Sequence, residues 1–181
     1  MKEPASKPRW QDLLYDQLRA ANITIFSYVP DAGHSVLIER ANADRDVASV
    51  PLTSEQEGVG IVAGAHLGGM RAVLMMQSSG VGNCINQLSL IKHGLFPFLT
   101  LVSMRGDFGE GNPWQYPMGQ AVEPTLSAMG VQCLWARRPD EVTSVTAAAL
   151  ATAFKAERAA AVLLSQSLLG AKAIGEGGDE Q

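Results

Sequence analysis

The sequence has few of the residues that build metal centres and disulfide frameworks. Its 181 residues include two cysteines, Cys84 and Cys133, which form no Cys-x-x-Cys pair. The three histidines are His34, His66 and His93, and none stands near another at metal-ligand spacing. We therefore expect no metal site built from this chain alone. Reduced thiols in a cytoplasmic protein are the expected state of the cysteines.

The sequence also lacks an excess of positive charge and any long apolar run. It has 14 Lys and Arg against 18 Asp and Glu, which gives a formal net charge of -4. No basic block offsets this balance, so a nucleic-acid or anionic-membrane partner is not expected. No apolar stretch approaches the roughly 18 residues that a membrane span needs. The N-terminal residues contain no signal-peptide core.

What the sequence does contain is a regular alternation of helical and extended patterns. Helices are predicted over 9–21, 35–43, 53–69, 84–94, 123–130 and 139–156. Strands are predicted over 23–29, 47–53, 71–77, 96–104, 131–136 and 160–166. The strands are continuous apolar runs, which is typical of a parallel sheet covered by helices on both faces. We predict an α/β fold with a three-layer, doubly wound parallel sheet. Residues 1–170 are expected to form a single domain and residues 171–181 a frayed tail.

Binding residues in such a fold are expected where strands end, because ligands bind at the carboxyl edge of a parallel sheet. Three segments qualify and are interpreted as loops: 30–34, 78–83 and the Gly- and Pro-rich stretch 105–120. Asp31 directly follows a strand and is either a turn former or a site acid, with the turn favoured. Arg105 is a candidate anion ligand, but pairing with Asp107 or capping a helix is equally compatible with its position.

The predicted helix 53–69 opens with carboxylates and then contains several glycines. Ser54 and Glu57 have the spacing of a capping box, and Glu55 is either a favourable charge at the helix N-terminus or a functional group. The glycines Gly60, Gly64 and Gly68 recur every four residues and so share one helix face. A bare face allows close packing, either against another helix at a subunit interface or against the chain's own sheet.

Several common catalytic signatures are missing. The segment 78–83 has no Gly-Lys-Ser/Thr and does not fit Gly-x-Gly-x-x-Gly, so it is neither of those phosphate-binding loops. No Gly-x-Ser-x-Gly elbow occurs. In "GDFGEGN" (106–112), Phe108 stands where a Gly-Asp-Gly magnesium-diphosphate motif needs glycine.

Three segments together carry a resemblance to a known family: "SEQEGVGIVAGAHLGG" (54–69), "LMMQSSGVGNCINQLSL" (74–90) and "LVSMRGDFGEGNPWQYPMGQ" (101–120). They resemble the pyrimidine-binding (Pyr) domain of thiamine-diphosphate-dependent decarboxylases. Within that group the resemblance is to the branch of sulfopyruvate decarboxylase alpha subunits and phosphonopyruvate decarboxylases. Matching segments extend from about residue 10 to 168.

The resemblance implies a role for each site residue. Glu55 corresponds to the catalytic glutamate, which hydrogen-bonds the aminopyrimidine of the cofactor and favours its imino tautomer, so that the cofactor can attack a 2-oxo acid and release carbon dioxide. The other cofactor-binding residues would be Gln77, Ser79, Gly80, Gly82 and Asn83. The substrate-binding residues would be Asp31, His34, Asn83 and Arg105. Glu57 remains a helix cap.

The resemblance also implies a partner. The diphosphate-binding domain is absent from these residues, so a beta subunit would hold Mg²⁺ and the diphosphate in a homo- or hetero-oligomer. The implied substrate is a small 2-oxo acid with a second anion, sulfopyruvate first and phosphonopyruvate second. Two other hypotheses remain open: a non-catalytic binding or regulatory subunit that kept the fold, and a flavodoxin-like nucleotide-binding domain.

Overall fold

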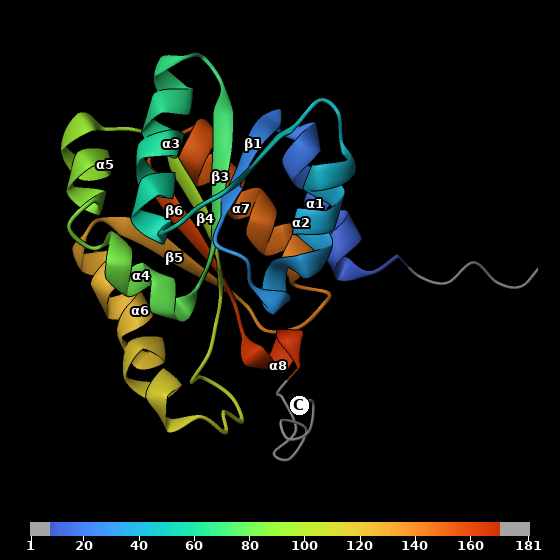
Figure 1. Ribbon diagram of the computed structural model, residues 1–181, viewed down its shortest axis with the longest axis vertical. Coiled ribbons are helices and arrows are strands. Elements are labelled where there is room, and N and C mark those ends of the chain that lie inside the picture. The colour runs from blue at the N-terminus through green and yellow to red at the C-terminus, as the bar shows by residue number, and fades with distance from the viewer. Residues whose placement is uncertain (1–7, 171–181) are drawn as a thin grey trace, which may run out of the picture.

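A single six-stranded sheet forms the centre of the protein (Figure 1). The computed structural model describes residues 8–170. Every neighbouring pair of strands is parallel, in the order β2-β1-β3-β4-β6-β5. The strands are β1 (Ile23–Tyr28), β2 (Ala48–Pro51), β3 (Arg71–Gln77), β4 (Phe98–Ser103), β5 (Val131–Ala136) and β6 (Ala159–Leu164). All six predicted strands are present.

Helices cover both faces of the sheet and bury two separate apolar clusters (Figure 1). One face carries α1 (Trp10–Ala20), α2 (Ser35–Ala43) and α7 (Val142–Phe154). The other carries α3 (Glu55–Leu67), α4 (Ser78–Cys84), α5 (Leu88–Gly94) and α6 (Tyr116–Ala128). Three short helices lie near strand ends: η1 (Ala32–His34), η2 (Pro113–Gln115) and α8 (Gln166–Leu169). The predicted three-layer, doubly wound α/β fold is confirmed.

The burial of each strand explains its composition. Every residue of β4 and of β6 is buried, because both are interior strands covered on two faces. The edge strand β2 is short and has no fully buried residue. The continuous apolar runs therefore mark the interior of a parallel sheet, as expected from the sequence.

The chain changes direction between β1 and β3. From β1 it continues into α2 on one face, and from β3 it continues into α4 on the opposite face. The segments that follow these two strands diverge and leave space at the carboxyl edge of the sheet. This edge is where open α/β sheets bind ligands.

All three segments predicted as loops contain helix. Residues 32–34 form η1, residues 78–83 belong to α4, and α6 begins at Tyr116, well before residue 123. Gly119 lies inside α6 against the backbone of Arg105, where a Cβ would collide with the Arg105 carbonyl oxygen. The glycine that suggested a loop is therefore needed for close contact between a helix and a loop.

The capping box predicted for α3 does not form with the predicted hydrogen-bond partners. Ser54 precedes the helix but makes no side-chain capping bond. The Glu57 carboxylate instead accepts a hydrogen bond from the Thr53 backbone N–H at 3.1 Å. Glu57 therefore caps the helix start one residue earlier than the motif predicts.

The glycines of α3 face two different environments. A Cβ on Gly58 would run into the Leu74 side chain, so this glycine lets α3 approach β3 closely. A Cβ on Gly60 or Gly64 would meet nothing within 4 Å. The face that carries Gly60 and Gly64 is therefore exposed, and packing against the chain's own sheet does not explain it.

Among residues 8–170, no helix combines the length and the apolar character needed to cross a membrane. The tail predicted for 171–181 lies outside the described residues.

Candidate functional site

Glu55 begins α3 and lies against α4 at the carboxyl edge of the sheet. Its side chain is largely buried, with 8% of the residue exposed. The Asn83 side chain donates a hydrogen bond from Nδ2 to Glu55 Oε2 at 2.8 Å. Glu55 Oε1 makes no hydrogen bond to any residue of the described chain. The carboxylate therefore keeps one acceptor oxygen available for a ligand.

Gly80 makes room for this carboxylate. A Cβ on Gly80 would overlap the Glu55 carboxyl group, with the Glu55 Cδ and Cγ both 2.5 Å away. We call Glu55, Gly80 and Asn83 the carboxylate cradle. The cradle brings together three residues from two helices that the family resemblance assigns to one cofactor site.

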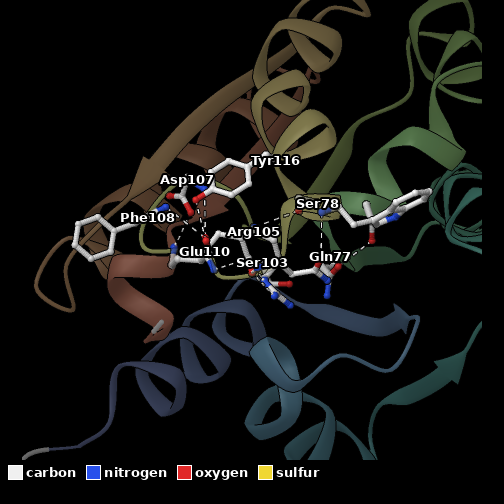
Figure 2. Close-up of polar contacts among 12 residues, drawn as sticks. Gln77, Ser78, Ser103, Arg105, Asp107, Phe108, Glu110 and Tyr116 are labelled. Carbon is white, nitrogen blue, oxygen red and sulfur yellow. Dashed lines mark hydrogen bonds and ion pairs between the residues drawn. The ribbon is translucent and has the colours of Figure 1, made fainter. Parts of the chain in front are cut away.

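A pocket of about 400 Å³ opens at the ends of β1, β3, β4 and β6, and none of the three cradle residues lines it. We call it the strand-end pocket. Its lining includes Asp31, Gln77, Ser103, Arg105 and Gln166. Figure 2 shows Gln77, Ser103 and Arg105 side by side at this edge, close to the start of α4. The pocket lies at the predicted place, where the chain diverges after β1 and β3.

Asp31 is held from three directions in this pocket. Its Oδ2 accepts hydrogen bonds from Ser103 Oγ at 2.6 Å and from the Gly33 N–H at 3.0 Å. Its Oδ1 accepts one from Gln77 Nε2 at 3.2 Å, and Ser79 Oγ in turn donates to Gln77 Oε1 at 2.9 Å. The bond to Gly33 makes Asp31 a turn former, and its position also makes it a wall of the pocket. The turn is confirmed, and the role of a site acid stays a prediction.

Arg105 is paired with Glu110 and not with Asp107. The guanidinium donates to the Glu110 carboxylate through both Nε and Nη2, at 2.5 and 2.7 Å. This pairing lowers the pKa of Glu110 to about 2 and raises the pKa of Arg105. Asp107 instead accepts hydrogen bonds from Ser165 Oγ and the Gln166 N–H. Figure 2 shows Glu110 turned toward Arg105.

The sequence comparison decides the family. A curated sulfopyruvate decarboxylase subunit alpha from Methanococcus maripaludis is 33% identical over 154 residues, which cover 84% of this chain and 92% of that protein. The subunit alpha from Methanocaldococcus jannaschii is 36% identical, over 71% of this chain and 76% of that protein. This chain belongs to the family of sulfopyruvate decarboxylase alpha subunits. The resemblance found in the sequence is confirmed.

More distant comparisons agree with this family. A phosphonopyruvate decarboxylase from Streptomyces viridochromogenes is 31% identical, over 78% of this chain and 34% of that protein. The sequence matches no protein-family model.

Solved structures share the fold. A 2-oxoglutarate:ferredoxin oxidoreductase from Magnetococcus marinus superposes with a TM-score of 0.72 at 15% identity, over 94% of this chain and 34% of that chain. A protein from Mycobacterium smegmatis, described as a candidate thiamin diphosphate-dependent enzyme, gives 0.68 at 17% identity, over 97% of this chain. This chain spans about a third of the length of each of these structures.

His34 is not placed at the strand-end pocket of this family member, contrary to the expectation. Its imidazole is fully buried, with Nε2 3.2 Å from the Met76 carbonyl oxygen and no partner for Nδ1. Burial lowers the pKa of His34. The ring turns under the strand ends because η1 folds back onto β3, so direct contact with a substrate is not supported.

Gly82 also differs from the other predicted cofactor residues. A Cβ on Gly82 would meet only the Met118 sulfur at 3.1 Å, so this glycine faces α6 and not the cradle. Ser79 is exposed and reaches the pocket only through Gln77.

Sequence reasoning missed three polar residues of the site: Ser103, Glu110 and Gln166. Ser103 and Gln166 lie at or just after the ends of β4 and β6, so the strand-end rule could have found them. Nothing in the sequence singles out Glu110, whose partner is fixed only by the fold of its loop.

Both cysteines lie in surroundings that keep their thiols protonated. Burial, with a smaller contribution from the Glu55 charge, raises the pKa of Cys84 to about 12. Burial raises the pKa of Cys133 to about 11. No group of three or more His, Cys, Asp or Glu side chains within 8–170 is arranged to hold a metal ion.

Proposed function

We propose that this chain is the pyrimidine-binding subunit of a thiamine-diphosphate-dependent decarboxylase that converts sulfopyruvate to an aldehyde and carbon dioxide. The family supplies the reaction class, since its curated members are named sulfopyruvate decarboxylase subunit alpha. The observation that carries the proposal is the buried Glu55 carboxylate, whose Oε1 accepts no hydrogen bond within the described chain. Phosphonopyruvate is the alternative substrate.

The carboxylate cradle fits the pyrimidine end of thiamine diphosphate. Gly80 leaves the Glu55 carboxylate uncovered by a side chain, and Asn83 fixes its other oxygen. When bound, the cofactor supplies a nucleophilic carbon and an electron sink for decarboxylation. Glu55 would hold a proton at Oε1 and share it in a hydrogen bond with a nitrogen of the pyrimidine ring. Its burial strengthens that hydrogen bond.

The strand-end pocket fits a small 2-oxo acid with a second anionic group. Asp31 is oriented by Ser103 and Gln77, so its carboxylate is held at a fixed place in the pocket. Arg105 has N–H donors beyond those that Glu110 occupies. A guanidinium binds a sulfonate or phosphonate through two parallel hydrogen bonds.

A beta subunit is proposed to hold Mg²⁺ and the diphosphate. The family names describe an alpha subunit, which supports a second kind of chain. The face of α3 that carries Gly60 and Gly64 is open, and it lies on the side of the helix away from the buried Glu55. A helix of the beta subunit could approach α3 closely at Gly60 and Gly64, because neither position carries a side chain.

The test is Glu55→Gln in the chain assembled with its beta subunit, with carbon dioxide release measured from sulfopyruvate and from phosphonopyruvate. Glutamine keeps the shape but cannot hold the proton. We expect turnover to fall at least ~100-fold, which is the usual scale for a positioned proton-transfer group.

Glu57→Gln is the matched control for this test. Glu57 is exposed in the first turn of the same helix and bonds only the Thr53 N–H. It should retain turnover within about twofold, because surface substitutions of this kind have small effects. If Glu55→Gln kept the turnover of the wild type, Glu55 would not have the proposed catalytic role. Assembly with the beta subunit but no carbon dioxide release by the wild type would indicate the non-catalytic subunit.

A further inference from the structure

The ion pair between Arg105 and Glu110 fixes one edge of the guanidinium. Glu110 receives Nε and Nη2 of Arg105, so this edge is fully used. Nη1 makes no hydrogen bond to any residue of the described chain. The Glu110 side chain is 3% exposed, whereas that of Arg105 is 23% exposed. Glu110 therefore lies behind Arg105, and the free edge of Arg105 remains accessible in the strand-end pocket.

Glu110 is itself held by groups other than Arg105. Its Oε1 accepts a hydrogen bond from the Asn112 N–H at 2.9 Å, and its Oε2 accepts one from Gln166 Nε2 at 2.8 Å. Gln166 is buried, and its Oε1 accepts the N–H groups of Asp107 and Phe108. The carboxylate is thus anchored to its own loop and to the segment after β6. Arg105 is aligned against a fixed support.

The pocket has no excess of positive charge, so net electrostatic attraction does not explain a preference for an anionic substrate. Arg105 contributes one positive charge, and Glu110 balances it at close range. Asp31 adds a negative charge to the pocket wall. Preference for a second anionic group then depends on the direction of the Arg105 donors and not on an excess of positive charge.

We infer that Glu110 is the positioning residue that orients Arg105 to bind the second anionic group of the substrate. It acts through Arg105 and does not contact substrate. This inference rests on the proposed function, because it assigns a selectivity device to the same pocket.

The test is Glu110→Gln in the assembled complex, with kcat/KM measured for sulfopyruvate and for pyruvate, which lacks the sulfonate. Glutamine keeps the size but cannot hold the guanidinium through two charged hydrogen bonds. We expect the ratio of kcat/KM for sulfopyruvate over pyruvate to fall about 10-fold or more, the scale of a lost charge-assisted hydrogen bond. The value for pyruvate should stay within about twofold, because no sulfonate is there to be bound.

Two controls separate positioning from stability. Asp44→Asn removes a part-buried ion pair with Arg19 of α1, and neither residue lines the pocket. It should leave the ratio unchanged. In an Arg105→Met background, Glu110→Gln should have no further effect on the ratio, because residues that act through one contact are not additive. Glu110→Asp keeps the charge but shortens the side chain, and should lower the ratio by less than Glu110→Gln.

Binding of sulfoacetate, a non-reacting molecule with a carboxylate and a sulfonate, gives a readout that does not need turnover. Calorimetry of the assembled complex should show weaker binding by Glu110→Gln than by the wild type. An unchanged ratio or unchanged sulfoacetate affinity would overturn the inference. An increase in either would mean that Glu110 competes with the substrate for Arg105. Failure of the wild type to decarboxylate, with sulfoacetate affinity still dependent on Glu110, would count against the proposed function alone.

Discussion

Gly80 has the sharpest steric requirement of the residues in the carboxylate cradle. A single methyl group there would occupy the space of the Glu55 carboxyl group. Gly80 is buried in α4, so the added methyl group would push the Glu55 carboxylate away from its hydrogen bond with Asn83. The cradle therefore tolerates only glycine at this position.

Gly80→Ala is expected to lower both stability and turnover. Overpacking of a well-packed site destabilises a protein by about 1–3 kcal/mol. Displacement of the Glu55 carboxylate should also reduce carbon dioxide release by about 10-fold or more, the scale of a displaced catalytic group. Urea unfolding and the decarboxylation assay measure the two effects.

Gly82→Ala in the same helix is the control for the stability effect. Its new methyl group meets only the end of the flexible Met118 side chain. The free energy of unfolding should stay level or rise, since alanine favours a helix over glycine. Equal losses in both variants would indicate a general weakness of α4 and not a clash with Glu55.

At this scale the sequence predicts which residues share an edge but not where their side chains point. Asp31, Gln77 and Arg105 follow strands, and the structure gathers them in one pocket. His34 also follows a strand, yet η1 turns its ring into the interior. Glu110 pairs with Arg105, five residues earlier, because the loop between them folds back, and no sequence pattern indicates that turn.

At the scale of elements, the exposed glycine face of α3 is the clearest departure from helix propensity. Glycine inside a helix destabilises it by about 1 kcal/mol relative to alanine. Gly60 and Gly64 gain no compensating contact within the described chain. We expect close contact with the beta subunit to offset the cost of these two glycines.

Gly64→Ala should therefore have opposite effects on the isolated chain and on the complex. The isolated chain should gain up to about 1 kcal/mol, because the methyl group enters open space and favours the helix. Affinity for the beta subunit should fall, since the same methyl group holds the partner away. Urea unfolding and calorimetric titration measure the two quantities. Improved stability with unchanged affinity would place the interface elsewhere.

The contribution of Glu110 to the free energy of unfolding should depend on pH. The pKa of Glu110 is lowered from 4.5 to about 2 in the folded chain, chiefly by its hydrogen bonds with Arg105. The unfolded chain therefore takes up this proton first as the pH falls. The stabilisation is complete above about pH 4.5 and is lost between there and about pH 2.

Glu110→Gln should be less stable than the wild type near neutral pH, and the difference should narrow as the pH falls below about 4.5. Urea unfolding at a series of pH values measures it. A difference that stays constant with pH would show that packing, and not charge, is what the substitution removes.

The elements that the sequence misses are those whose composition suggests loops. The segment 78–84 combines serines and glycines, but α4 forms because it packs between α3 and α6 and buries Ser78, Gly80, Val81 and Cys84. The start of α6 carries Pro117 and Gly119, which resemble turn residues. Tertiary contact outweighs propensity in both places.

At the scale of the whole molecule, the fold is predictable because the interior strands are mostly apolar and helices alternate with strands. The strand order is not, since nothing local places β6 between β4 and β5. That order fixes which loops lie together: the segment after β6 brings Gln166 to Glu110 and completes the support of Arg105.

The chain alone is expected to release no carbon dioxide from sulfopyruvate, because the proposed beta subunit holds the diphosphate and Mg²⁺. Activity should appear on titration with the beta subunit and saturate at a fixed stoichiometry. The isolated chain should also self-associate through the open face of α3, which sedimentation at increasing concentration measures. Turnover by the chain alone would contradict the division of the site between two subunits.

The two native thiols make the natural chain a convenient background for site-specific labelling. A maleimide dye reacts with thiolates, and burial raises the pKa of both the buried Cys84 and the half-buried Cys133. Leu67 is 76% exposed near the end of α3. A dye attached through Leu67→Cys would report docking on that helix by fluorescence, with no native cysteine to be removed first.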